Sequence, residues 1–102
     1  MEELDNWLSQ QHNGLQTYKA FQQRVSLLLT QDRDHAALFY LLASIVGRFI
    51  DAYEEHPLPV DVADEAFKKL RDLVQRAAQT MKGPAAGQIK LLNEIASGED
   101  LG

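Results

Sequence analysis

The stretch HAALFYLLASIVGRFIDAYEE, residues 35–55, is the most apolar part of the chain and decides its fold. On a helical wheel, the centre of one face consists of Leu38, Leu42, Ile45 and Phe49. Further apolar side chains flank that centre and widen the apolar arc to about half to two-thirds of the circumference, more than a typical surface helix shows. We therefore expect this helix to lie at the centre of a bundle or to be shared with another chain.

Segments with a helical period lie on both sides of this stretch. Turn-forming residues break the chain at 13–14, 57–59 and 83–84, and a softer break lies at 31–34. The remaining helices are therefore expected over about 2–12, 15–30, 62–82 and 85–97. No segment alternates with period two, so no strand is expected. We predict an all-α fold: a compact antiparallel bundle of four to five helices with the long apolar third helix central.

Finer features follow from the same pattern. The length predicts a single helical-bundle domain over residues 1–97 and a flexible C-terminal tail over 98–102. Gly14 is expected to end the first helix in a left-handed conformation. Asp32 or Asp34 is expected to cap the third helix, and Asp61 the fourth. The buried face of the fifth helix is expected to consist of Ile89, Leu92, Ile95 and Ala96.

Composition excludes several classes of protein. The chain has no cysteine, so a disulfide framework, a thiol nucleophile and a thiolate metal site are excluded. Its net charge of −5 argues against binding to nucleic acid or to an anionic membrane surface. The acidic N-terminus lacks the pattern of a secretory signal. The apolar run 36–47 is shorter than the roughly 20 residues that span a bilayer. We expect a cytoplasmic protein with no membrane partner.

No catalytic or metal-binding pattern is present. The three histidines are His12, His35 and His56, and none has a second histidine three or four residues away. His35 and His56 fall at opposite ends of one predicted helix, so they cannot share a metal ion. No serine lies in a nucleophile motif, and the glycines at 83 and 87 lack the rest of a phosphate-binding loop. We expect no cofactor, no metal ion, no catalytic residue and therefore no enzyme.

Six residues are candidates for binding a partner. Four of them belong to the polar strip of the third helix, which comprises Tyr40, Ser44, Gly47, Arg48 and Asp51. The small side chains of Ser44 and Gly47 would let a neighbouring backbone approach closely, although the strip could equally be the solvent side. The other two candidates are apolar side chains that a dimer would cover, Trp7 and Leu27.

These observations predict a non-enzymatic protein-interaction module: a small adaptor, regulator or chaperone-like bundle whose partner is another protein or a second copy of itself. One alternative is a bundle that binds a small-molecule ligand in a cavity lined by Phe39, Leu42 and Phe67. Another is a helix-turn-helix-like transcription regulator whose fifth helix presents Gln88 and Lys90. The long preceding helix and the acidic charge count against that second alternative.

Overall fold

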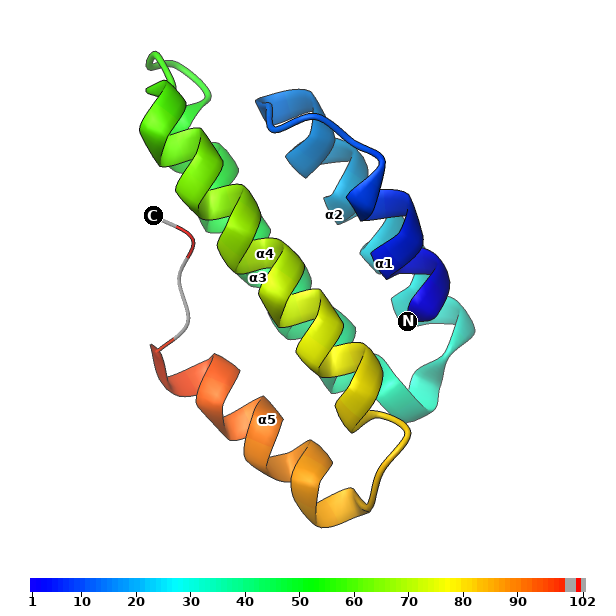
Figure 1. The fold of residues 1–102 in the computed structure, drawn as a ribbon. Helices are drawn as coiled ribbons and strands as arrows, with labels where there is room; N and C mark the ends of the chain where they lie inside the picture. Colours follow the sequence, from blue (N-terminus) through cyan, green and yellow to red (C-terminus); the bar gives the residue numbers. More distant parts are fainter. Residues whose placement is uncertain (99–100, 102) are drawn as a thin grey trace.

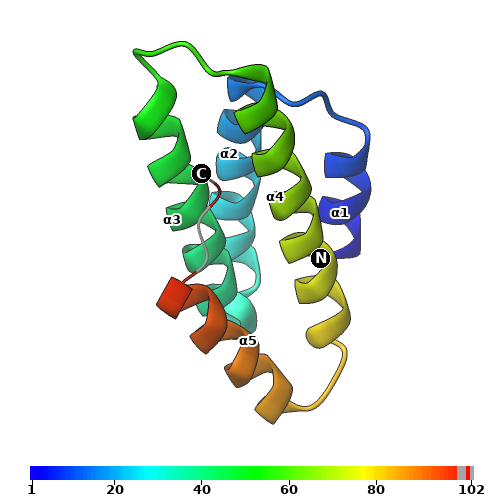
Figure 2. The same cartoon turned by 60° about the vertical axis from the view of Figure 1, so that its left-hand side comes forward.

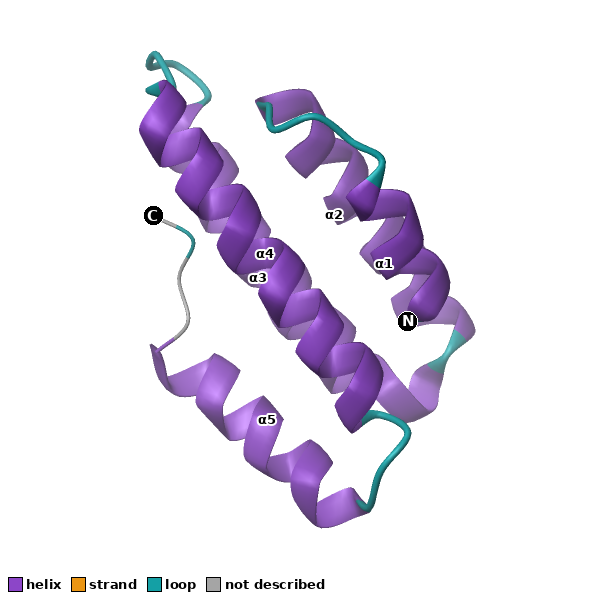
Figure 3. Ribbon diagram, viewed as in Figure 1, coloured by secondary structure: helices purple, strands orange, loops and turns teal. Residues whose placement is uncertain are grey.

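The computed structural model describes residues 1–98 and 101, and within them the chain forms five α-helices and no strand (Figures 1 and 3). The helices are α1 (Glu2–Ser9), α2 (Leu15–Gln31), α3 (Ala36–Tyr53), α4 (Val60–Thr80) and α5 (Ala85–Gly98). A short 3₁₀ turn, η1 (Arg33–His35), joins α2 to α3. The predicted all-α helical bundle is confirmed.

Each helix packs against one or two of the others. The most extensive contact joins the antiparallel helices α2 and α3, α1 lies along α4, and α5 packs on both α3 and α4 (Figure 2). Polar contacts hold the two ends of the α1 region against α4 and the turn after it: Lys82 in that turn with Glu2 at one end, and Asp64 of α4 with Asn13 at the other. Among the described residues, the α2/α3 pair therefore keeps one flank that no other helix covers.

The helix α3 is amphipathic over most of its length, and its four predicted core side chains are at most 2% exposed. Each of α3 and α4 contributes seven buried side chains, so the two helices share the central position. Aromatic rings extend the core at the end of the bundle where α2 begins and α3 ends. The ring centroids of Tyr18 and Phe49 lie 4.9 Å apart, and those of Phe49 and Tyr53 lie 5.1 Å apart. Burial of this apolar surface is the main source of stability.

By length and composition alone, the helical segment Arg33–Tyr53 is apolar enough to cross a membrane. The length estimated from the apolar run 36–47 was too short, because the helix continues for nearly two further turns with only a few charged residues. The core helix of a soluble protein meets the same criterion, and the buried side chains of this segment belong to the packed core. The expected absence of a membrane partner therefore stays a prediction.

Three expectations about helix ends are wrong. Gly14 is extended, with φ −166° and ψ 164°, and it precedes α2 rather than closing α1 in a left-handed turn. No side-chain cap begins α3, because the Asp32 carboxylate contacts the Nδ1 atom of His35 instead, at 2.7 Å. The helix α4 begins at Val60 after Pro59, so Asp61 lies inside the first turn, where its charge still favours the helix dipole.

The buried face of α5 also differs from the expected one. Leu91 and Ile95 are buried, whereas Ile89 is 58% exposed. Apolar residues occur on more than one side of this helix, so its own periodicity could not select the face; contact with both α3 and α4 selects it. Of the tail predicted over 98–102, Gly98 ends α5 and Leu101 is buried against the core, while 99, 100 and 102 lie outside the described residues.

Candidate functional site

A shallow groove runs along the uncovered flank of the α2/α3 pair. Its volume is about 530 Å³. The helix α2 lines it with Gln22, Ser26 and Leu29, and α3 lines it with Tyr40, Ala43, Ser44, Gly47, Arg48 and Asp51. We call this surface the α2/α3 groove. Four of the six predicted partner-binding residues lie in it.

Small residues of α3 form the floor of the groove. Ala43, Ser44 and Gly47 are spaced so that they lie on one side of the helix. The part of this chain that approaches Gly47 is a side chain rather than a backbone: a Cβ atom at Gly47 would lie 2.8 Å from Nε2 of Gln22. The Gln22 Nε2 also donates a hydrogen bond to the carbonyl oxygen of Ala43, at 3.3 Å, and so bridges the two helices.

The rim of the groove is polar and unusually free of internal partners. Tyr40 is 64% exposed, and Arg48 and Asp51 are exposed as well. Within the part of the chain that the structure describes, the Tyr40 hydroxyl, the Arg48 guanidinium and the Asp51 carboxylate make no hydrogen bond or ion pair. The Ser44 hydroxyl, in contrast, donates to the Tyr40 carbonyl oxygen at 2.9 Å. The rim therefore offers a donor, a cation and an anion to a partner.

An ion pair closes one end of the groove. Lys19 Nζ on α2 lies 3.2 Å from Glu54 Oε1, just past the end of α3, one turn beyond Gln22 and Asp51. Both side chains are more than one third exposed, so this pair contributes at most about 1 kcal/mol to stability. It nevertheless satisfies the charges at that end and leaves Arg48 and Asp51 as the unpaired charges of the groove rim within the described chain.

The two remaining candidates, Trp7 and Leu27, lie elsewhere. Leu27 is 58% exposed and lines a second, smaller groove of about 220 Å³ between α1 and α2. Trp7 on α1 is half-buried, and the Arg24 guanidinium lies 4.4 Å from its ring centroid. The six candidates therefore divide between two flanks of α2. The groove residues of α2 itself were not predicted, although the four- and three-residue spacing of Gln22, Ser26 and Leu29 could have indicated a shared side.

The histidines and carboxylates form no metal-binding group in the described part of the chain, where no three of them lie close enough to hold an ion. His35 is engaged with Asp32, and the hydrogen bond from His35 is the main cause that lowers the pKa of the Asp32 carboxyl. His12 and His56 are exposed. The contact between His35 and Asp32 makes the turn between α2 and α3 polar.

The residues of the expected ligand cavity belong to the interior. Phe39 and Leu42 are at most 1% exposed, and Phe67 is half-buried against the same core. The grooves described above have other lining residues. A ligand between these three side chains would have to displace packed core atoms, so the observed packing does not favour this alternative.

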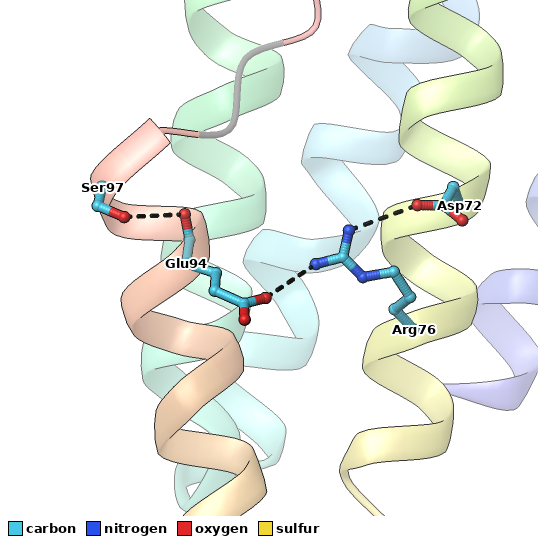
Figure 4. Close-up of polar contacts among 4 residues, drawn as sticks. All are labelled: Asp72, Arg76, Glu94 and Ser97. Atoms are coloured by element: carbon cyan, nitrogen blue, oxygen red, sulfur yellow. Dashed lines mark hydrogen bonds and ion pairs between the residues drawn. The ribbon is translucent and has the colours of Figure 1, made fainter.

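Side-chain contacts fix the turn between α4 and α5 and link the two helices. Gln88 Nε2 donates to the carbonyl oxygens of Met81 and Gly83, at 3.3 and 3.1 Å, and so closes the turn. Arg76 of α4 links Asp72 of its own helix, at 3.4 Å, to Glu94 of α5, at 3.3 Å (Figure 4). The Gln88 side chain that a recognition helix would present is therefore engaged in the turn, while Lys90 stays exposed and lines a surface that also includes Arg76 and Glu94.

Comparison of the chain with models of protein families, with curated proteins and with solved structures finds no match.

Proposed function

We propose that this chain is a non-enzymatic protein-interaction module that self-associates through the α2/α3 groove. The observation that carries the proposal is the combination of a floor of small residues with an exposed Tyr40 and two charged side chains that have no partner within the described chain. We also expect the protein to act in the cytoplasm.

The composition of the groove is typical of a protein interface. Tyrosine and arginine are enriched at interfaces and often contribute most to the binding energy, because both bury a large apolar area while keeping a hydrogen-bonding end. The groove is open and shallow, whereas pockets for small ligands bury most of the ligand surface. A helix from another protein chain suits its shape better, since the small side chains of Ala43 and Ser44 leave room for a neighbouring helix.

A dimer through this flank would use the full length of both helices. The helices α2 and α3 contain 17 and 18 residues. Each is therefore about 25 Å long. Two such pairs facing each other across a twofold axis would form a four-helix arrangement, and a specific interface needs about 800 Å² from each partner. Ordinary homodimers use the same patch on both subunits, so a single groove is enough.

The test is the solution mass measured by light scattering after size exclusion, over a series of concentrations. We expect a mass that rises toward twice the 11.5 kDa of the chain. In the variant Ser44→Arg, a long charged side chain fills the groove floor, and we expect the mass to stay monomeric. Leu27→Arg places the same side chain on the other flank of α2 and is the matched control, which should dimerise normally. A monomer at every concentration of the unaltered protein would show that the proposal is wrong.

A further inference from the structure

The groove residues of α3 carry a pattern that reads the same in both directions. Tyr40, Ser44, Gly47 and Asp51 are spaced four, three and four residues apart. All four line the groove. An antiparallel copy of this helix, rotated by a twofold axis between Ser44 and Gly47, places Ser44 opposite the partner's Gly47 and Tyr40 opposite the partner's Asp51. The spacing thus allows the isologous contact that a symmetric dimer requires.

From this pattern we infer that two copies of the chain pack α3 against α3, antiparallel, with the helices crossing at Ser44 and Gly47. The inference rests on the proposed function and adds the orientation and register of the dimer. At this crossing Ser44 is the small residue that leaves room for the partner helix, while the Gln22 side chain of the same chain already lies beside Gly47. Tyr40 and Asp51 lie 11 residues apart, so the dimer has two equivalent Tyr40–Asp51 contacts, one on each side of the crossing.

The chemistry at both ends of the pattern is complementary. The Tyr40 hydroxyl can donate a hydrogen bond and the carboxylate of Asp51 can accept it, and neither is engaged within the described chain. Arg48 lies one turn from Asp51 on the same rim. In this register, Arg48 and the partner's Tyr40 are offset by about 5 Å along the helix axis. The guanidinium of Arg48 can therefore reach the face of the partner's tyrosine ring. All three free groups of the rim thereby gain a partner.

A parallel arrangement of the same two helices would be unfavourable. With the twofold axis along the helices, each residue faces its own copy, so Asp51 would lie opposite the partner's Asp51 and Arg48 opposite the partner's Arg48. Like charges at such positions repel, whereas the antiparallel register brings unlike groups together. Opposed helix dipoles favour the antiparallel arrangement as well, by a smaller amount. The charges of the rim therefore select one orientation.

Cysteine cross-linking tests this register cleanly, because the chain contains no cysteine of its own. The variant Tyr40→Cys is mixed with ¹⁵N-labelled Asp51→Cys, treated with a short bismaleimide and analysed by mass spectrometry. The antiparallel register predicts a mixed light–heavy product in at least tenfold excess over either product of two identical chains. The mixed dimer is also favoured because its second end keeps an intact Tyr40–Asp51 pair. Leu27→Cys, of similar exposure, is the matched control and should give no cross-linked dimer.

The other outcomes overturn the inference in different ways. A predominant Tyr40→Cys product of two identical chains would show a parallel dimer, and cross-linking at Leu27 would show a dimer through the other flank. In both cases the register is wrong while self-association stands. If light scattering shows that the unaltered protein is monomeric, the proposed function and the register are both wrong. Circular dichroism of each variant confirms that it is folded before cross-linking.

Discussion

Gln22 of α2 occupies the space that a side chain at Gly47 of α3 would need. A Cβ atom at Gly47 would lie 2.8 Å from the Gln22 Nε2, which itself donates to the Ala43 carbonyl oxygen at 3.3 Å. Glycine in a helix lowers stability by about 1 kcal/mol relative to alanine. At this position that loss is offset by a side-chain hydrogen bond that joins the two groove-forming helices.

The variant Gly47→Ala should therefore leave the free energy of unfolding almost unchanged. The gain in helix propensity is about 1 kcal/mol, and the Gln22 amide, the end of a flexible side chain, would turn away and lose a bond of similar value. In the background Gln22→Ala, the same substitution should stabilise by the full amount. Urea unfolding of the four proteins measures the difference. Equal effects in both backgrounds would show that Gln22 and Gly47 are not coupled.

The main helices could be predicted from the sequence because their apolar periodicity is strong. In α3, for example, Leu38, Leu42, Ile45 and Phe49 mark the buried face through their spacing alone, and the structure confirms it. The face of α5 could not be chosen in this way, since Ile89 and Leu91 are equally apolar and only the packing of α5 on α3 and α4 distinguishes them. Local capping was also misjudged, because Asp32 contacts the His35 ring rather than the start of α3.

Only the α3 side of the candidate site could be predicted from the sequence. Tyr40, Ser44, Gly47 and Arg48 share one side of a single helix, so the 3.6-residue period is enough to group them. The contribution of Gln22 from α2 depends on the antiparallel register of two helices, which no local pattern encodes. The contacts between α2 and α3 also decide which polar groups of the groove rim remain without a partner in the described chain.

Two leucines at opposite extremes of exposure test the assignment of core and surface. Leu42 is 0% exposed, and Leu42→Ala should lower the free energy of unfolding by about 3 to 5 kcal/mol through lost burial and a cavity. Leu27 is 58% exposed, and Leu27→Ala should change it by less than about 0.5 kcal/mol. Urea unfolding at low protein concentration compares them. A large effect at Leu27 would mean that this side chain is buried within the folded chain, and that its assignment to the surface is wrong.

The contact between Arg24 and Trp7 predicts a measurable optical change. The guanidinium lies 4.4 Å from the ring centroid of the chain's single tryptophan. Arg24→Met keeps the apolar stem and removes the cation, so the Trp7 emission should shift to the red as water reaches the ring, with a stability loss of about 0.5 to 1 kcal/mol. Arg33→Met, in the turn before α3, is the control. Unchanged emission in Arg24→Met would contradict the contact.

The buried hydroxyl of Tyr18 makes the stability of the fold depend on alkaline pH. The Tyr18 side chain is 0% exposed, and its hydroxyl donates to the Ala63 carbonyl oxygen at 3.4 Å. Burial, assisted by the nearby negative charge of Asp64, raises the pKa of Tyr18 from 10.0 to about 12. Below pH 10 the tyrosine is neutral in both the folded and the unfolded chain, so its contribution to stability is fully present.

Between pH 10 and pH 12 the unfolded chain releases this proton and the folded chain retains it, so stability is lost as the pH rises through that window. A difference of about two pKa units corresponds to a loss of about 3 kcal/mol. Tyr18→Phe removes the ionisable group and should show a loss smaller by this amount over the same pH range, although its stability at neutral pH is slightly lower without the hydrogen bond. Urea unfolding followed by circular dichroism between about pH 8 and pH 12 measures both proteins. Parallel curves for the two proteins would mean that Tyr18 ionises as readily in the folded chain as in the unfolded one, and that the hydroxyl is not buried as the structure describes.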